Sequence, residues 1–355
     1  RGAGDIDQSG SQRHRVGGQV KRSHLSEDSG LTSMCGAHLS TVDSVDMTTQ
    51  GATAVGIANI SMDGTILDTW YPEPELIDGT GLVPGTERLG ARDLPASMLK
   101  LVLLDEDRMV EQVAVRTTIA DLQASPIDAH DVYLRLHLLS HRLVRPLELN
   151  MDGSLRRLST VVWTNKGPCT PDNFEFVRTA LRSRGLIHVY GIEKLPRMVD
   201  YVVPSGVNIA EAERVRLGAY LAPGTRVLRE GYVSFNSGSL GAARIEGRLS
   251  SSAVIGEDTD VGLSSAIMSR RRSDGLRDPM TVGMNCRFGV SSGILGLSIG
   301  DNCSIGANIV LEIDSQIWDA DAGHHIPAAS LNGQSNWSVR REVGHSEPVL
   351  RRTWQ

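Results

Sequence analysis

Residues 249–267 read LSSSAVIGEDTDVGLSSAI, and this stretch decides the fold. Its aliphatic residues Leu249, Ile255, Val261 and Ile267 recur every six positions, and glycine follows two of them. Six residues is too long a period for an α-helix or for the alternation of a simple strand. It matches one flat side of a triangular coil with about eighteen residues per turn.

The same spacing continues on both sides of this stretch. The further members are Ile209, Val215, Leu221, Val227 and Val233 before it, and Val282, Phe288, Ile299, Ile305, Leu311 and Ile317 after it. Stacked turns would bury these side chains in one continuous core. We therefore predict a mainly β chain, with a left-handed parallel β-helix of hexapeptide repeats over residues 204–320. Left-handed crossovers are rare among parallel connections, so the repeat is a specific signal.

Two segments break the period. Residues 234–248 and 269–281 are predicted to leave the coil as loops. Residues 321–355 are predicted to form a short, polar C-terminal tail, with a strand at residues 337–341.

The sequence before the coil divides into two parts. Residues 1–46 are rich in Ser, Gly, Asp and Arg and predict a disordered extension or leader, with folded sequence starting at Met47. Residues 47–203 predict a small α/β domain. Its expected strands are 56–60, 65–70, 101–104, 113–118 and 188–192, and its expected helices are 128–143 and 174–184. His137 and His141 lie four apart on the first helix and could chelate a metal, but with no third ligand nearby we favour a polar or partner-facing side of the helix.

Composition excludes several classes of protein. The formal net charge of −6 argues against nucleic acid as a partner, and no apolar run is long enough to span a membrane. The four cysteines are scattered without metal-ligand spacing, which is typical of a reducing cytoplasm.

The predicted coil carries carboxylates, whereas other enzymes built on hexapeptide-repeat coils use histidines in this region. No histidine occurs between Ser205 and Ala322, so neither histidine-held zinc nor a catalytic histidine fits this region. Glu213, Glu230 and Glu246 remain as candidates for chemistry.

Several blocks of the sequence are similar to a known family. They are Tyr133–Val144, Val161–Asn165 with Gly167–Cys169, Pro196–Gly206, Glu213–Ala219, Glu230-Gly231, Phe235-Asn236, Leu240–Ala242 and Ile245-Glu246-Gly247-Arg248. Together they resemble the actinobacterial type of tetrahydrodipicolinate N-succinyltransferase. The resemblance runs from about Gly56 to Arg341 and implies a homotrimer that acts on small molecules.

The resemblance also implies a reaction, in which succinyl-CoA acylates the amino group of open-chain tetrahydrodipicolinate on the diaminopimelate route to lysine. Glu246 falls in the family's catalytic block. A carboxylate in a partly dry groove can accept the proton of the amine, because desolvation raises its pKa, or it can attack the thioester and form an acyl anhydride. Arg248 would contact the acyl donor through a guanidinium suited to carboxylate or phosphate oxygens.

Further positions correspond to the family's donor-binding residues. They are Leu263, Ala266, Ser269, Val290, Gly306, Ala307, Asp314, Pro327, Arg340, Arg341, Glu342 and Val343. Many depart from the family pattern, most clearly Ser269 in place of a glycine, where a side chain crowds the approach of the acyl group. The run Arg270 to Arg272 either replaces lost phosphate contacts or is a solvated loop.

Glu213 and Glu230 match the family's metal-associated positions near the trimer axis. Copies of one carboxylate facing each other repel unless a cation intervenes, and Mg²⁺ suits oxygen ligands. Glu213 stands where relatives have Asp. The alternative therefore remains that the trimer axis holds no metal ion and is filled by water or lined by protonated carboxyl groups.

Three functions remain possible from the sequence. The first is the succinyltransferase, in the cytoplasm. The second is a catalytically degenerate trimeric paralogue that acts as a partner subunit or ligand-binding regulator, and the third is an acyltransferase with an altered donor or acceptor.

Overall fold

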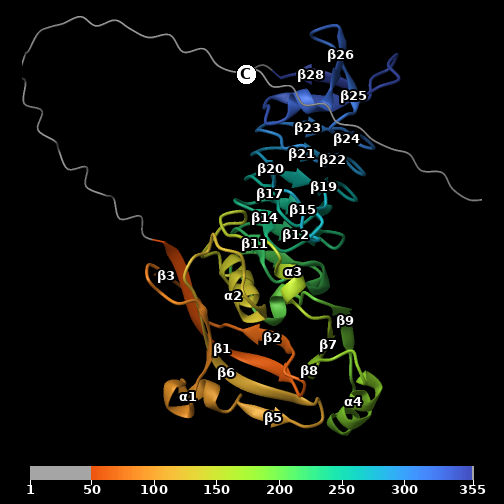
Figure 1. Cartoon of the computed structure of the whole chain (residues 1–355). Helices are drawn as coiled ribbons and strands as arrows, with labels where there is room; N and C mark the ends of the chain where they lie inside the picture. The colour runs from red at the N-terminus through yellow and green to blue at the C-terminus, as the bar shows by residue number, and fades with distance from the viewer. Residues whose placement is uncertain (1–48, 354–355) are drawn as a thin grey trace, which may run out of the picture. The chain divides into compact units, whose positions relative to one another are not determined.

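The computed structural model describes residues 49–353 of the chain (Figure 1). The predicted extension over residues 1–46 and the predicted start at Met47 lie outside the described residues. All of the elements below belong to one compact unit of the chain.

The N-terminal domain is built on an antiparallel sheet. β1 (Gln50–Ser61) pairs with β2 (Ile66–Trp70), β3 (Glu75–Asp78) and β6 (Val110–Ile119), while β4 (Gly85–Arg88) and β5 (Leu103–Asp105) pair with β6. The turn between β1 and β2 is a hairpin that contains Asp63-Gly64, a pair favoured in such turns. Gly64 adopts a φ of +88° there, and Asp63 accepts a hydrogen bond from the amide of Thr65 at 2.9 Å. Two short helices, η1 (Ala91–Asp93) and α1 (Ala96–Leu99), link β4 to β5.

Helix α2 (Ala129–Ser140) is buried along its whole length between this sheet and the coil. Asp128 caps its first turn by accepting from the amide of Asp131 at 2.9 Å. His137 donates from Nδ1 to the carbonyl of Tyr133 at 2.7 Å and accepts from the amide of Tyr71 at 3.2 Å. The predicted polar or partner-facing side of this helix is therefore wrong, because His137 is a fully buried core residue whose two ring nitrogens are both hydrogen-bonded.

A second, smaller sheet completes the N-terminal domain. Its order is β8 (Gly167–Cys169), β7 (Val161–Thr164) and β9 (Val189–Glu193). The remaining helices of this region are α3 (Ser154–Arg157), α4 (Phe174–Leu181), η2 (Arg182–Arg184) and η3 (Met198–Asp200).

From Asn208 onward the chain winds through three parallel sheets, which confirms the predicted three-sided coil (Figure 1). The first sheet contains β10 (Asn208–Ile209), β12 (Arg226–Val227), β15 (Arg244–Ile245), β18 (Asp260–Val261), β21 (Arg287–Phe288) and β23 (Ser304–Ile305). The second contains β13 (Tyr232–Val233), β16 (Arg248–Leu249), β19 (Ala266–Met268), β22 (Gly293–Leu295) and β24 (Val310–Glu312). The third contains β11 (Ala219–Leu221), β14 (Ser237–Ser239), β17 (Ala253–Ile255) and β20 (Met280–Val282). The aliphatic residues of the repeat stack in register inside the coil.

The predicted loop at residues 234–248 is wrong, because this segment stays in the coil. β14 pairs with β11 and β17, and β15 pairs with β12 and β18. The aliphatic signal is missing because Ser239 occupies an interior position, where its hydroxyl lies 2.7 Å from that of buried Thr225. The predicted loop at 269–281 leaves the coil only over residues 269–279, since Met280 already belongs to β20.

The end of the chain closes the coil. β27 (Trp337–Arg340) pairs in parallel with β23 and antiparallel with β28 (Val349–Arg352), and β25 (Gln316–Asp319), β26 (His324–Pro327) and η5 (Ala328–Leu331) complete this region. The predicted strand near residue 337 is present. The predicted polar tail is wrong, because the side chains of Trp337, Leu331 and Leu350 are fully buried.

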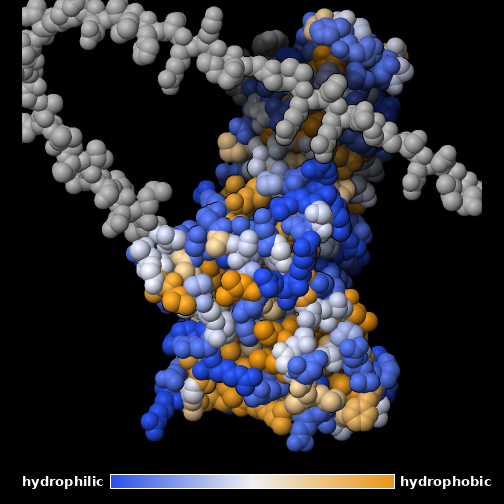
Figure 2. Space-filling model, in the orientation of Figure 1, coloured by the Kyte–Doolittle hydropathy of each residue, from blue (hydrophilic) through white to orange (hydrophobic). Residues whose placement is uncertain are grey.

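The surface of the N-terminal domain carries an apolar area. Figure 2 shows apolar side chains gathered at the lower edge of this face, in the region that Figure 1 labels β5, and Val102, Leu103 and Leu104 are exposed. Within residues 49–353, no helix is both long and apolar enough to cross a membrane.

Candidate functional site

The three candidate carboxylates occupy one edge of the coil, which we call the carboxylate corner. Glu213, in η4 (Ala212–Arg214), precedes Val215, which bridges to Val233 of the second sheet. Glu230 lies between β12 and β13, and Glu246 lies between β15 and β16. Because these strands are in register on successive turns, the three residues stack along the corner between the first and second sheets.

Glu246 is held by an ion pair. Its Oε2 lies 2.6 Å from the guanidinium of Arg244, which also lies 3.0 Å from Asp260 on the next strand of the first sheet. The hydrogen bond to Asp260 raises the pKa of Arg244 further, so the guanidinium stays charged. The Glu246 side chain is 27% exposed, so it is oriented by its partner yet open to a ligand.

The corner at Glu246 is two residues shorter than the corner one turn earlier. Only Glu246 and Gly247 connect β15 to β16, whereas 228–231 connect β12 to β13. The amides of Glu246 and Gly247 both donate to the carbonyl of Val261, at 2.8 and 3.1 Å. A Cβ at Gly247 would lie 2.6 Å from Ser265 Oγ, so glycine permits the tight approach that fixes Glu246.

Arg248 points outward from the second sheet, two residues after Glu246. Its guanidinium carbon lies 4.1 Å from the centre of the Tyr232 ring, which is in register on the preceding strand. The next residues in this row are Ala266 and Gly293. Ala266 carries only a methyl group and Gly293 no side chain, so no long side chain follows Arg248 in this row.

The predicted donor-binding residues divide among four places. The carboxylate corner continues through Leu263, Val290, Gly306, Ala307 and Arg341, and the outer face of the second sheet carries Arg248 and Ala266. The other edge of the second sheet carries Ser269 and Asp314. The closing region at the end of the coil contains Pro327, Arg340, Glu342 and Val343. Thus the first three groups surround the second sheet. The fourth lies at the end of the coil, where Glu342 pairs with Arg351 at 2.6 Å.

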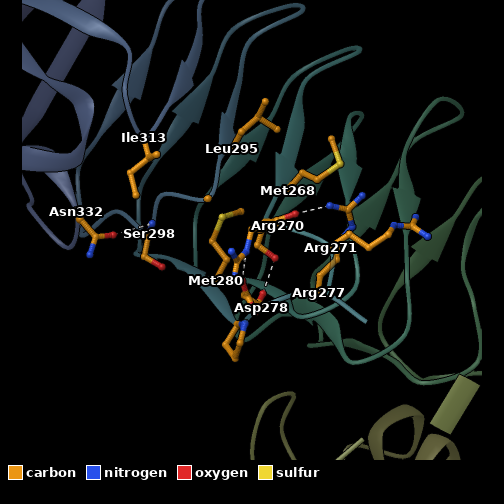
Figure 3. A pocket seen from close by; sticks show the side chains of 13 residues that line it. Met268, Arg270, Arg271, Arg277, Asp278, Met280, Leu295, Ser298, Ile313 and Asn332 are labelled. Carbon is orange, nitrogen blue, oxygen red and sulfur yellow. Dashed lines mark hydrogen bonds and ion pairs between the residues drawn. The ribbon is translucent and has the colours of Figure 1, made fainter. Parts of the chain in front are cut away.

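A cleft of about 710 Å³ opens at the far edge of the second sheet from Glu246 (Figure 3). Ser269 lines it beside an apolar wall of Met268, Met280, Leu295 and Ile313. The Ser269 hydroxyl donates to the carbonyl of Asp278. Of the lining residues, the sequence singled out Ser269 and, as one interpretation of the arginine run, Arg270 and Arg271, whereas the apolar ones belong to no motif.

One chain does not supply a full set of metal ligands at the carboxylate corner. Glu213 and Glu230 are exposed, and the guanidinium of Arg214 lies 2.9 Å from Glu211 and 3.5 Å from Glu230. Across residues 49–353 there is no group of three or more His, Cys, Asp or Glu side chains arranged to hold a metal ion.

Comparisons with known proteins agree with this architecture. A profile described as the middle region of tetrahydrodipicolinate N-succinyltransferase matches residues 158–197, and one described as the hexapeptide repeat of succinyl-transferase matches residues 279–312. A 2,3,4,5-tetrahydropyridine-2,6-dicarboxylate N-succinyltransferase from Salinispora tropica is 49% identical over 218 residues, which are 60% of this chain and 66% of that protein, just under two thirds of its length. A protein of the same name from Pseudomonas putida is 31% identical over 314 residues, 81% of this chain and 90% of the relative.

A solved structure extends the likeness of fold. A crystal structure from Campylobacter jejuni, described as a 2,3,4,5-tetrahydropyridine-2-carboxylate N-succinyltransferase, superposes with a TM-score of 0.71 over 84% of this chain and 91% of that chain. At 22% identity this similarity concerns the fold alone.

Proposed function

Because the chain belongs to the tetrahydrodipicolinate N-succinyltransferase family, we propose that it transfers a succinyl group from succinyl-CoA to the amino group of open-chain tetrahydrodipicolinate. The chain is an acyl-CoA-dependent N-acyltransferase of the diaminopimelate route to lysine. The observation that carries the reaction is Glu246, a carboxylate held by Arg244 at the shortened corner beside the outer face of the second sheet.

Glu246 has two chemically complete roles. As a general base, it accepts the proton of the amine as the nitrogen attacks the thioester carbon; the C–S bond then breaks, and the departing CoA thiolate takes that proton from Glu246 and leaves as a thiol. As a nucleophile, its carboxylate oxygen attacks the thioester carbon, the C–S bond breaks and CoA leaves as a thiolate. The amine then attacks the succinyl carbon of the anhydride, which forms the amide and frees the Glu246 carboxylate, and the proton lost by the amine passes to the CoA thiolate. In both, Arg244 balances the negative charge and fixes the direction of the carboxylate.

The assembly that we propose is a homotrimer of left-handed coils with active sites shared between neighbouring copies. Glu246 and the Ser269 cleft lie at opposite edges of the second sheet of one chain. A threefold arrangement can bring one edge of a copy against the other edge of its neighbour. We place this reaction in the cytoplasm, where a CoA thioester is available.

Mg²⁺ at the trimer axis is part of the same proposal. Glu213 and Glu230 offer the oxygen ligands that Mg²⁺ prefers, but a complete set requires carboxylates from three copies. The ion would neutralise their mutual repulsion and stabilise the assembly.

A thiol-release assay with succinyl-CoA and tetrahydrodipicolinate tests the reaction. We expect turnover by the wild type, and a loss of about 10²–10⁴ in kcat for Glu246→Ala, the range typical of removing a general acid or base. Glu257→Ala, at an exposed glutamate of the next turn, is the matched control.

Other outcomes select the alternatives. Assembly without turnover or CoA binding would indicate a degenerate paralogue. Turnover only with another acyl-CoA would indicate an altered donor.

A further inference from the structure

Loop 269–279 contains four arginines, and the structure gives two of them internal partners. Arg270 lies 3.3 Å from Asp278, and Arg272 lies 2.8 Å from Asp152 and 3.0 Å from Asp274. The charges of these two side chains are therefore already balanced by carboxylates of the chain. Arg271 and Arg277 remain.

The loop is docked rather than freely solvated. Leu276 is buried in the main core, and the ion pair from Arg272 to Asp152 ties the loop to the segment before α3. Arg271 and Arg277 face each other across an antiparallel bridge, and Arg277 donates to the carbonyl of Ser269. Their positions are thus fixed by backbone pairing before any ligand arrives.

Arg271 faces Arg277 across the bridge, and Arg248 lies near enough for its charge to act on Arg277; we call these three side chains the arginine cluster. Burial, followed by the charges of Arg271 and Arg248, lowers the pKa of Arg277. Across residues 49–353, none of the three forms an ion pair with a carboxylate. Three like charges held together are mutually repulsive, and a bound anion would relieve that repulsion.

The cleft beside the cluster has two kinds of surface. Figure 3 shows Arg271 and Arg277 next to each other, with Met268, Leu295 and Ile313 along the wall that leads away from them. An apolar wall that ends at guanidinium groups suits a short alkyl chain that carries an anionic end.

We infer that the arginine cluster binds a substrate carboxylate: the free end of the succinyl group or a carboxylate of the amine acceptor. This inference rests on the proposed function. In the proposed trimer the cleft of one copy faces Glu246 of its neighbour, so the cluster would lie near the reacting end of the donor. The phosphates of CoA are separated from the thioester by the long pantetheine arm.

Calorimetric titration with succinyl-CoA and butyryl-CoA tests the inference, because the two acyl groups have the same length and differ in the terminal carboxylate. For Arg271→Met and Arg277→Met we expect the affinity for succinyl-CoA to fall about tenfold or more and that for butyryl-CoA to hold. Arg270→Met removes an arginine of the same loop that already pairs with Asp278, and should change both affinities by the same factor.

The remaining outcomes separate the sources of the carboxylate. Unchanged succinyl-CoA affinity with a tenfold higher KM for the acceptor assigns the cluster to the acceptor. Equal weakening of succinyl-CoA, butyryl-CoA and CoA itself would overturn the inference, because phosphates would then be the ligand. The inference would also be overturned if Arg271→Met and Arg277→Met matched Arg270→Met both in their affinities for the two thioesters and in the KM for the acceptor.

A wild type that binds both thioesters but turns over neither would refute the proposed reaction alone. The selectivity between the two thioesters would still test the cluster in that case.

Discussion

His137 illustrates how a single buried residue sets the pH dependence of this fold. Burial lowers its pKa from 6.5 to about 3, even though the hydrogen bond to the Tyr133 carbonyl opposes the shift. The imidazole is therefore neutral in the folded chain. It lies between the sheet of the N-terminal domain and the coil, with Tyr71 and Tyr201 against its ring.

The unfolding free energy should fall as the pH is lowered from about 6.5 toward 3. In this window the unfolded chain binds a proton that folded His137 does not, which costs up to about 1.4 kcal/mol per pH unit. His130 and His141, whose pKa values burial also lowers, add to the slope. The His137→Gln variant should show a smaller slope of unfolding free energy against pH. Denaturant unfolding of the wild type and the variant from pH 4 to 7 measures the two slopes. Equal slopes would show that His137 titrates normally.

At the scale of elements, the shortened corner between β15 and β16 is the feature that positions Glu246. The corner before it reads Leu228-Arg229-Glu230-Gly231, and the corner at Glu246 keeps only Glu-Gly. Because this corner has two residues fewer, the amides of both Glu246 and Gly247 donate to the carbonyl of Val261.

Insertion of Leu-Arg between Ile245 and Glu246 would restore the longer corner and copy the preceding turn. The coil should keep its circular-dichroism spectrum, because the inward positions are again six apart. The displaced carboxylate should lose about 100-fold or more in kcat, since small misplacements of a catalytic group are costly. Insertion of Gly-Ser after the exposed Gly323 is the control, and wild-type turnover by the Leu-Arg protein would argue against this role of the corner.

Residues of the repeat made most of the coil predictable, and the failures have physical causes. Ser239 and Thr225 satisfy each other inside the coil, so a buried turn without an aliphatic side chain looks like a loop in sequence. His137 looks like a surface residue in sequence because the bond from the Tyr71 amide, which satisfies its second ring nitrogen, comes from a residue 66 positions away. In the cleft, Met268 and Leu295 belong to ordinary repeat strands, and only the folded loop gives them a ligand-facing surface.

At the scale of the whole molecule, the proposed sharing of active sites has a quantitative consequence. Glu246→Ala and Ser269→Trp each disable a site, the first at the carboxylate corner and the second by filling the cleft. If a site takes Glu246 from one copy and the cleft from its neighbour, random mixed trimers of the two should recover roughly one quarter of the wild-type activity.

The measurement is the thiol-release assay after the two proteins are unfolded together and refolded. Each variant refolded alone is the control. No recovery in trimers of verified mixed composition would place both groups within one copy.

The pairing of β27 with β23 and β28 has a consequence beyond local stability. A stack of parallel strands ends in a row of backbone amides and carbonyls that can template the strand of another chain. Here the end of the first sheet is covered by β27 and β28 of the same chain, and Trp337 of β27 is fully buried. We expect a chain truncated before β27 to expose β23 of the first sheet, whose free backbone groups could pair with a strand of another copy.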